Sequence, residues 1–351
     1  MKTRILTTKA GAKLRLSEIG LGTAPLGNLF ERLDEDEAVG TVATAYKAGI
    51  RLFDTSPHYG NGVAELRCGA VLRRYPRESF VLSTKVGRWM NPFERVAPRN
   101  SKVFSPGFAG ALSHRPVFDY SYDGTMRSVE QSLLRTGLDR LDILLIHDVD
   151  VWTHGAEYEN RFREAMEGTY KALDKLRASG AVQAIGIGVN EADVAERFAR
   201  VGDFDVMLLA GRYSLLEQPA AESFLPLAVE EKIGIMLGGV FNSGILATGA
   251  VKGAKYNYAP APSNIMERVR RIEIVCRKHR VPLRRAAVAF ALAHPAVISV
   301  VLGAVKPSEI KANLAAIARP VPAALWQDLK DQGLLSQASK TPGRRRKQTA
   351  V

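Results

Sequence analysis

The feature that most constrains the fold of this chain is the alternation of short apolar runs with longer amphipathic segments along its whole length. The short runs are rich in β-branched residues and have the length of buried strands. Strands are predicted over residues 19–21, 50–54, 80–85, 141–147, 182–189, 204–209, 234–237 and 297–302. Apolar strands that alternate with helices are typical of a parallel sheet covered by helices on both faces. Because there are eight repeats, we predict an α/β protein with a closed (β/α)8 barrel (TIM barrel).

Amphipathic segments with a helical period connect these strands. Helices are predicted over residues 35–48, 63–74, 125–136, 162–178, 191–200, 222–231, 265–279 and 308–318. Asp34, followed by Glu37 three residues later, has the pattern of a capping box at the start of the first helix. Gly49 and Gly180 follow the ends of two helices, where glycine commonly terminates the helical conformation.

Two further short strands precede the first repeat. Residues 3–7 and 13–16 flank a turn at Ala10-Gly11, and we predict a β-hairpin that closes the floor of the barrel. Barrels of this kind commonly exceed about 250 residues as one domain. Residues 1–335 are therefore predicted to form a single domain, and residues 336–351, which are small, polar and basic, a disordered tail.

The main alternative fold is an open, doubly wound sheet, which would require a glycine-rich G-x-G-x-x-G fingerprint after a strand. Gly20, Gly22 and Gly27 instead follow the pattern G-x-G-x-x-x-x-G, and no helix begins directly after them. The third glycine comes two residues too late for that fingerprint. The closed barrel is therefore the preferred prediction.

The chain carries an excess of positive charge, with 49 Lys and Arg against 36 Asp and Glu, or +13 in total. Five of these charges belong to the tail, at Lys340, Arg344, Arg345, Arg346 and Lys347, which leaves +8 for the rest. A basic run of this kind is typical of a solvated terminus. The remaining charge suits an anionic cofactor and substrate, and we predict no nucleic-acid partner.

Composition and targeting signals indicate a cytoplasmic protein. Hydrophobic residues make up 46% and charged residues 24% of the chain, which is ordinary for a globular protein. Residues 1–13 contain no apolar stretch typical of a signal peptide, and no run of 18 uncharged apolar residues follows, so no membrane contact is predicted. The two cysteines, Cys68 and Cys276, are too few for a disulfide scaffold and are predicted to be buried apolar residues.

Two segments, residues 87–122 and 238–262, are too long for ordinary connections, and a shorter one spans residues 148–160. Each follows a predicted strand, so in a barrel all three would lie at the C-terminal face, where such folds place their active sites. Loops of this length are usually functional lids. Trp89 and Trp152 on these loops either line the substrate entrance or only pack the lids.

Four polar residues follow the predicted strands at this same rim: Asp54, Tyr59, Lys85 and His147. Each has a plain structural explanation when it is considered alone, such as a turn aspartate or a core histidine. Together they are more informative, because three neighbouring strands direct them to one end of the barrel. We therefore predict that they form one site.

Elementary chemistry indicates what this group can do. A tyrosine has a pKa of about 10, and a nearby lysine cation should lower it toward roughly 7–8. An aspartate partner keeps a buried lysine charged, and a histidine beside the phenol can orient a substrate oxygen. The group contains no nucleophile, and His147 and His154 lack a third ligand, so no metal site is predicted. Such a site suits proton transfer coupled to hydride transfer.

These motifs resemble those of the aldo-keto reductase family. The resemblance rests on Phe53-Asp54-Thr-Ser-Pro-His58-Tyr59-Gly with Gly62 and Glu65 after it, on Thr84-Lys85, and on Leu-Ile-His147. It extends from about residue 16 to residue 313. It implies a (β/α)8 barrel that binds a nicotinamide dinucleotide in extended form. It further implies that Tyr59 is the general acid/base, that Lys85 and Asp54 tune it, and that His147 positions the substrate oxygen, with His58 near the substrate.

The sequence departs from the common family pattern at several cofactor positions. Gly-Val-Asn190 replaces the usual Ser-Asn after strand five, so Asn190 is expected to hold the carboxamide. The usual glutamine of strand six is Ala210, and the aromatic residue at the end of strand seven is Gly238. Tyr213 or Phe241 is expected to stack on the nicotinamide instead.

The C-terminal cofactor segment contains Lys306 and Glu309. Members that prefer NADPH tend to carry basic residues where Val305 and Glu309 stand here. A carboxylate suits a ribose 2′-hydroxyl and repels a 2′-phosphate. Although Lys306 restores some positive charge, we expect NAD to be preferred over NADP. Other expected cofactor contacts are Gly22, Thr23, Asn242, Ser243, Gly244, Leu246, Gly303 and Asn313.

Residues 238–249 and 186–191 resemble a branch of the family that contains D-threo-aldose (L-fucose) 1-dehydrogenases and pyridoxal 4-dehydrogenase. These enzymes oxidise a cyclic hemiacetal carbon to a lactone, so an aldose of the L-fucose or D-arabinose type is the expected substrate. Pyridoxal oxidation and a generic aldehyde or ketone reductase are the alternatives within this class. A non-catalytic regulatory barrel is the alternative from another class, and the oligomeric state stays open.

Overall fold

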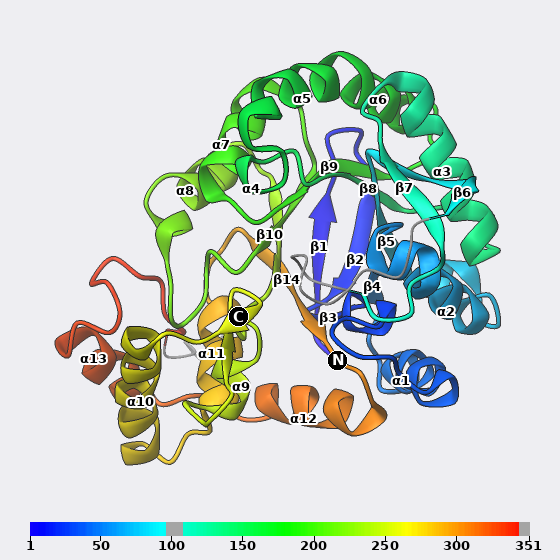
Figure 1. Ribbon diagram of the computed structural model, residues 1–351. Helices are drawn as coiled ribbons and strands as arrows, with labels where there is room; N and C mark the ends of the chain where they lie inside the picture. Colours follow the sequence, from blue (N-terminus) through cyan, green and yellow to red (C-terminus); the bar gives the residue numbers. More distant parts are fainter. Residues whose placement is uncertain (96–107, 344–351) are drawn as a thin grey trace, which may run out of the picture.

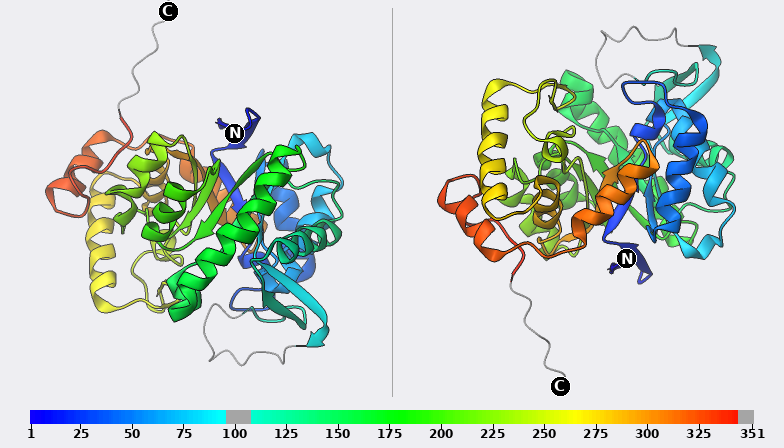
Figure 2. Two further views of the ribbon diagram at one scale, coloured as in Figure 1. Left: turned by 90° about the horizontal axis from the view of Figure 1, so that it is seen from above. Right: turned by 90° about the horizontal axis from the view of Figure 1, so that it is seen from below.

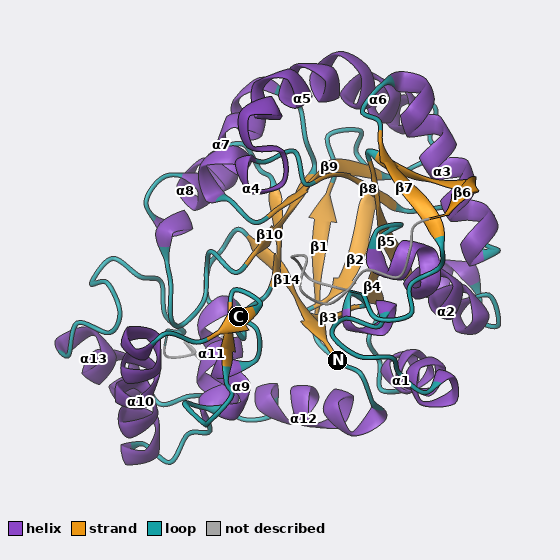
Figure 3. Ribbon diagram, viewed as in Figure 1, coloured by secondary structure: helices purple, strands orange, loops and turns teal. Residues whose placement is uncertain are grey.

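The computed structural model describes residues 1–95 and 108–343, and its centre is a closed barrel of eight parallel strands (Figures 1 and 3). The strands, in chain order, are β3 (Ile19–Gly22), β4 (Leu52–Asp54), β5 (Val81–Val86), β8 (Ile143–His147), β9 (Ala184–Val189), β10 (Val206–Ala210), β11 (Gly234–Gly238) and β14 (Val297–Gly303). Each pairs with its neighbours in this order, and β14 closes the ring against β3. The predicted (β/α)8 barrel is confirmed, and every predicted strand range overlaps one of these strands.

The predicted N-terminal hairpin is also present. It consists of β1 (Thr3–Thr7) and β2 (Lys13–Ser17), which pair in antiparallel register. Its apolar side chains enter the lower barrel interior and form one cluster with residues from the surrounding strands: Leu6, Leu14, Leu16, Leu52, Val81, Ile143, Leu145, Val206, Met236, Ile298 and Val301 are among its members. Figure 2 shows the hairpin at the end of the barrel opposite to the projecting β6–β7 hairpin. The plug therefore leaves the C-terminal face open.

A ring of helices surrounds the barrel (Figure 3). These helices are α1 (Glu35–Lys47), α2 (Val63–Leu72), α3 (Tyr122–Thr136), α4 (Val151–His154), α5 (Tyr158–Glu164), α6 (Tyr170–Ala178), α7 (Ala192–Val201), α8 (Phe224–Glu230), α9 (Ile245–Thr248), α10 (Ser263–Lys278), α11 (Leu283–Ala291), α12 (Pro307–Ile317) and α13 (Ala323–Asp331). The capping prediction for α1 is correct, since the Asp34 carboxylate accepts a hydrogen bond from the Glu37 N–H at 2.9 Å. Gly49 follows its end with φ 91°.

Besides the short helices α4 and α9, the described part of the chain contains two helices, α11 and α13, outside the predicted ranges. The helix predicted over residues 265–279 exists as α10, but α11 contacts β14 directly, while α10 packs outside it against α13 (Figure 1). The segment Leu283–Ala291 is only nine residues long and rich in alanine, and its buried residues include Ala287 and Phe290. Contacts with β14 assign α11 to the wall of helices around the barrel.

The three long connections all lie at the C-terminal face. Residues 87–122 form the antiparallel pair β6 (Arg88–Arg95) and β7 (His114–Phe118), with residues 96–107 outside the described part of the chain. Residues 238–262 include α9 and a small hairpin of β12 (Lys255–Tyr256) and β13 (Ala259–Pro260). Residues 148–160 contain α4 and the start of α5.

The tail begins beside α13, where the Lys330 ammonium donates to the Gln337 carbonyl at 2.9 Å. Its arginines and Lys347 lie in residues 344–351, outside the described residues. Both cysteines are buried and unpaired, and burial raises the pKa of each thiol to about 12, as expected of inert core residues. Among the helices in the described ranges, none is both long and apolar enough to cross a membrane.

Close contact between β9 and β10 depends on Gly186. It pairs with Val206, and a Cβ at this glycine would lie 1.6 Å from the Val206 carbonyl oxygen. Gly186→Ala should therefore lower the free energy of unfolding by roughly 2–3 kcal/mol, because the barrel wall must shift to admit a methyl group. Gly40→Ala is the matched control: its Cβ would meet only Pro307 at 4.0 Å, and the change should stabilise α1 by about 0.5–1 kcal/mol. Chemical denaturation checks both, and equal stabilities would contradict the assigned contact.

Candidate active site

A buried ion pair lies at the carboxyl ends of two adjacent strands. Asp54 ends β4, Lys85 lies near the end of β5, and only 2% and 1% of their surfaces are exposed. The Lys85 ammonium donates to both carboxylate oxygens of Asp54, at 3.0 and 2.9 Å, and to the Thr55 carbonyl at 2.7 Å. All three N–H groups of the ammonium therefore have acceptors. This full pairing is what permits a charged lysine at such depth.

Tyr59 lies directly beside this pair. It opens a tight turn, Tyr59–Gly62, and the centre of its ring is 5.0 Å from the Lys85 Nζ. The turn depends on Gly60, which has φ 67° and whose missing side chain leaves room for the Gly27 carbonyl oxygen. The structure thus brings the predicted phenol and amine together.

The expected lowering of the phenol pKa is wrong for this structure. The pKa of Tyr59 lies well above its usual value of 10, first because the phenol is buried and then because of the negative charges of Asp54 and Asp148. Lys85 does not offset these effects, because its N–H groups and its charge are already matched by Asp54 and Thr55. Tyr59 is therefore a neutral phenol.

His147 ends β8 on the other side of the phenol. Its ring meets the Tyr59 ring edge-on, with 6.1 Å between their centres. The Nδ1 atom lies 3.2 Å from the Ser56 hydroxyl and 3.0 Å from an Arg88 guanidinium nitrogen. The pKa of His147 is well below its usual value because of burial first, and then because of the positive charges of Arg88 and Lys85. The imidazole is therefore neutral as well.

Sequence reasoning missed two charged residues beside the histidine. Arg88 is almost fully buried and forms an ion pair with Asp148 at 2.7 Å. Both residues come shortly after a predicted catalytic residue near a strand end: Arg88 comes three residues after Lys85, and Asp148 comes directly after His147. A charged residue just after the carboxyl end of a barrel strand is a candidate for the active site, and this signal in the sequence could have identified both residues.

Aromatic side chains from two lids cover the same region. Phe108 lies 5.2 Å from the His58 ring and 6.1 Å from the Tyr59 ring. Tyr258 occupies the turn between β12 and β13, where its backbone N–H donates to the Ser243 hydroxyl at 2.9 Å. The sequence offered no signal for either residue, because lid loops have no regular period.

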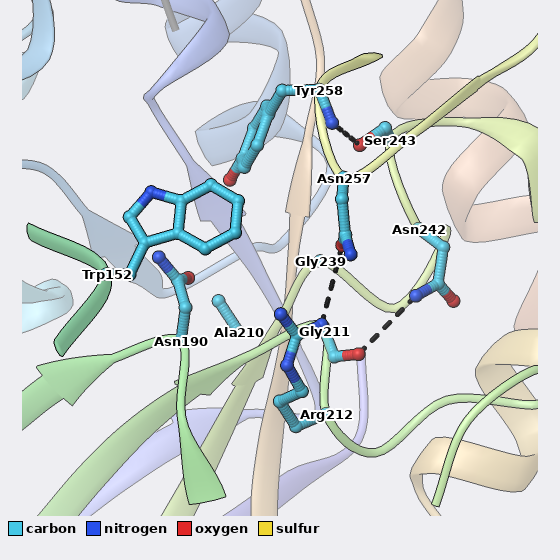
Figure 4. A pocket seen from close by; sticks show the side chains of 10 residues that line it. All are labelled: Trp152, Asn190, Ala210, Gly211, Arg212, Gly239, Asn242, Ser243, Asn257 and Tyr258. Atoms are coloured by element: carbon cyan, nitrogen blue, oxygen red, sulfur yellow. Dashed lines mark hydrogen bonds between the residues drawn. The ribbon is translucent and has the colours of Figure 1, made fainter. Parts of the chain in front are cut away.

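A pocket opens beside these residues, at the ends of β9, β10 and β11 (Figure 4). Trp152, Asn190, Ala210, Gly211, Arg212, Gly239, Asn242, Ser243, Asn257 and Tyr258 line it. In Figure 4 the rings of Trp152 and Tyr258 lie on one side, and Asn190 and Arg212 lie below them. Of the expected contacts, Asn190, Asn242, Ser243 and Trp152 are thus at one cavity.

The pocket has the chemistry that a dinucleotide requires. The Asn242 side-chain oxygen is buried and lacks a hydrogen-bond partner in the described part of the chain, so it is available to a ligand donor. Gly239, with φ 61°, brings the backbone close to Gly211, where a Cβ would lie 2.9 Å from the Gly211 nitrogen. Arg212, which the sequence analysis did not select, adds a positive charge suited to a phosphate. The residues present therefore fit an anionic dinucleotide.

Two of the candidate aromatic residues lie away from the pocket. Tyr213 is buried in the core, where its ring stacks on Phe290 at 5.0 Å instead of facing the pocket. Trp89 lies on β6 next to Arg88, and successive residues of a strand face opposite sides. Arg88 therefore takes the side of the active site, whereas the Trp89 indole donates to Asp119 at 3.2 Å and lies under Arg127 at 4.5 Å.

Phe241 does not line the pocket either, and the Arg284 guanidinium lies 5.5 Å from its ring. Arg284 donates to the Asn313 side chain at 2.9 Å, so these three residues form a cluster near α12. Leu246 is fully buried in the core. Gly244 opens α9 with φ 102° and has open space at its missing Cβ.

The remaining expected contacts lie at the ends of β3 and β14. Thr23 follows Gly22 and donates through its hydroxyl to the Asp54 carbonyl at 3.0 Å. Gly303 ends β14, and its carbonyl accepts from the Asn313 amide at 3.3 Å. Lys306 precedes α12. Within the described ranges, no group of three or more His, Cys, Asp or Glu residues has the arrangement of a metal site.

Comparisons with known proteins agree with this geometry. A family model described as "Aldo/keto reductase family" matches residues 18–332. The chain is 40% identical to a pyridoxal 4-dehydrogenase of Microbacterium luteolum, over 92% of this chain and 96% of that protein. It is also 40% identical to a D-threo-aldose 1-dehydrogenase of a Pseudomonas species, over 93% of this chain and 97% of that protein. Among solved structures, it resembles an aldo-keto reductase from Bacillus halodurans in its holo form, with a TM-score of 0.71, 23% identity, and coverage of 97% and 100% of the two chains.

The two loop tryptophans should respond differently to a bound dinucleotide. Trp152 lines the pocket, whereas Trp89 packs against α3 residues. Titration with NAD should quench intrinsic fluorescence, and Trp152→Phe should remove most of the quenching while Trp89→Phe retains it. If both variants lost the same fraction of the quenching, the pocket would not be the dinucleotide site.

Proposed function

The chain belongs to the aldo/keto reductase family, and from this premise we propose that it oxidises the hemiacetal hydroxyl of a cyclic aldose to a lactone with NAD. The observation that carries this proposal is the buried Lys85–Asp54 pair beside the Tyr59 phenol, with neutral His147 facing the same ring. The phenol can exchange one proton and the imidazole can bind one substrate oxygen. Both are required when a hydride is transferred from an alcohol carbon.

The chemistry divides between the ligand and the protein. When bound, oxidised nicotinamide dinucleotide supplies the hydride acceptor and a positive charge. Tyr59 takes the proton of the anomeric hydroxyl as the hydride leaves the anomeric carbon, so that the C–O single bond becomes the carbonyl of the lactone. Because the Tyr59 pKa is raised, Tyr59 must lose its own proton to water before it can accept another, and the positive charge of Arg88 favours the resulting phenolate.

The other residues orient the reactants. His147 can donate through Nε2–H to the substrate oxygen, because its Nδ1 faces Arg88 and Ser56. Asn190, Asn242, Ser243 and Arg212 would hold the dinucleotide in the pocket. Trp152, Tyr258 and Phe108 add aromatic surface near the mouth, which suits the C–H face of a sugar ring.

Pyridoxal is the second candidate substrate, because one relative of 40% identity is a pyridoxal 4-dehydrogenase and the same aromatic surface suits a pyridine ring. A generic aldehyde reductase would use the same four residues in the opposite direction. A purely regulatory barrel has no need for a buried ion pair beside a phenol, so the intact group Asp54, Tyr59, Lys85 and His147 favours catalysis.

The proposal is tested by a substrate panel and a single variant. With NAD, the protein should oxidise L-fucose or D-arabinose more efficiently than pyridoxal, and the product should be a lactone by mass spectrometry. Tyr59→Phe should lower turnover by at least about a thousandfold, because the proton acceptor is lost, while NAD affinity changes little. Preference for pyridoxal would select the second candidate, and more than a few per cent residual activity would contradict the role of Tyr59.

The preference for NAD rests on Glu309. Its carboxylate lies at the start of α12 and accepts a hydrogen bond from the Val305 N–H at 2.8 Å, which fixes a negative charge where a 2′-phosphate would be repelled. We therefore expect a higher kcat/KM with NAD than with NADP. Glu309→Gln keeps the acceptor for Val305 and removes the charge, so it should improve the use of NADP more than that of NAD. Equal or better efficiency of the unmodified protein with NADP would overturn this assignment.

A further inference from the structure

The ion pair of Arg88 and Asp148 lies against the ring of His147. Arg88 reaches His147 Nδ1 at 3.0 Å and the Asp148 carboxylate at 2.7 Å. The other ring nitrogen, Nε2, lies 3.4 Å from the second Asp148 oxygen. The guanidinium and the carboxylate thus contact both ring nitrogens, on opposite edges of one imidazole.

Several contacts fix the position of Arg88. Gly87, with φ 96°, turns the chain from β5 into β6, and a Cβ there would lie 2.3 Å from the Tyr120 ring. The Arg88 guanidinium lies 4.3 Å from the centre of the Phe118 ring, and its carbonyl accepts a hydrogen bond from the Ser128 hydroxyl at 2.8 Å. Only 5% of the residue is exposed. The side chain therefore has little freedom to leave the histidine.

The chemistry of the two side chains decides where the histidine proton lies. A guanidinium has only donors and stays protonated at every pH that a protein tolerates. The nitrogen that it faces must therefore carry a lone pair, so the proton of neutral His147 is on Nε2. The Ser56 hydroxyl, at 3.2 Å from Nδ1, can donate to the same lone pair. A second proton on the ring, at Nδ1, would point the Nδ1–H at an N–H group of the Arg88 guanidinium.

The backbone of His147 is held as well. The Tyr120 hydroxyl donates to the His147 carbonyl at 2.8 Å, and it lies 3.0 Å from the His154 Nε2. Because Tyr120 already donates to that carbonyl, it accepts from His154. The carbonyl and one ring nitrogen of His147 are thus both held by neighbouring side chains.

We propose that Arg88 is a positioning residue that locks His147 as the Nε2–H tautomer, so that this histidine donates to the substrate oxygen. Asp148 holds Arg88 in place and weakly accepts from Nε2–H until a substrate oxygen takes over that contact. The consequence for activity rests on the proposed oxidoreductase function, but the tautomer itself does not.

The lock also keeps the histidine neutral over a wide pH range. Burial, Arg88 and Lys85 all lower the pKa of His147, in that order. Protonation would therefore begin only well below pH 6.5, and donation through Nε2–H should be constant at neutral pH. The charged and titratable groups that face His147 are Lys85 from β5, Arg88 from β6, Asp148 after β8, and His58 and Tyr59 after β4.

The tautomer is tested by nitrogen NMR of the protein with 15N-labelled histidine, without added substrate. In the unmodified protein His147 should show an unprotonated Nδ1 and a protonated Nε2, with no titration down to about pH 6. His147→Gln assigns the signals. Arg88→Met should give a mixture of tautomers and a histidine that titrates at higher pH, because the donor and the positive charge are both removed. An unchanged Nδ1 signal in Arg88→Met would overturn the proposal.

Three further variants separate the proposed role from a loss of structure. Arg88→Met leaves the buried Asp148 charge unpaired, which can prevent folding. The double variant Arg88→Met/Asp148→Asn removes both charges, so it avoids this penalty and should still show mixed tautomers of His147. Arg88→Lys keeps one donor and the charge, and should restore much of the single tautomer. Arg127→Met, on the opposite side of β6, removes the cation above Trp89 and should leave the His147 signals unchanged.

Kinetics give an independent readout. Arg88→Met should lower kcat/KM for the aldose roughly tenfold to a hundredfold and shift the acid limb of its pH profile to higher pH, with little change in the KM for NAD. A merely structural role would lower stability without moving that limb, and this result would overturn the proposal. If the unmodified protein oxidised nothing on the panel while the NMR result held, the proposed function would fail and the tautomer lock would stand.

Discussion

The rest of the active site depends on the burial of one cation. Lys85 is inaccessible to water, and it stays charged because Asp54 and the Thr55 carbonyl accept all three of its hydrogen bonds. The pairing requires that β4 and β5 be neighbours in register, which the barrel provides by aligning Asp54 with Ser83. Tyr59 and His147 are arranged around this pair, so the barrel wall sets the geometry of the site.

Two buried ion pairs surround two neutral proton-handling groups. Lys85 and Asp54 lie on one side, Arg88 and Asp148 on the other, and the phenol and the imidazole lie between them. Burial first and then the carboxylates raise the pKa of Tyr59, whereas burial first and then the cations lower the pKa of His147. Each pair is close to neutral as a unit, so burial does not require a net charge in the core. The site is therefore set to gain or lose a proton only when a ligand changes the balance.

The sequence predicted which strand-end residues come together, but it predicted the lids poorly. Asp54, Lys85 and His147 could be found because they interrupt apolar strand patterns at one predictable end. Whether Trp89 lines the entrance or packs the lid stayed open in the sequence, because the start of β6, and with it the alternation that turns Arg88 inward, is not visible there. Tyr213 was misplaced because an aromatic residue near a strand end is equally suited to the core, where Phe290 of α11 stacks on it. The helix α11 itself was missed because it is short and follows α10 after only a few residues, so that the two were not separated in the sequence.

The sequence by itself determined the eight-stranded barrel, its hairpin plug and the identity of the four chemical groups. Local periodicity and residue type carry that information, because each strand must bury its own apolar residues. Only the tertiary structure decided that Arg88 and Asp148 meet at His147, and that Tyr258 and Phe108 come over the site from two separate lids. It also decided the protonation states, since pKa values depend on burial and on charges far apart in the chain. Contacts between such distant residues leave no pattern in one sequence.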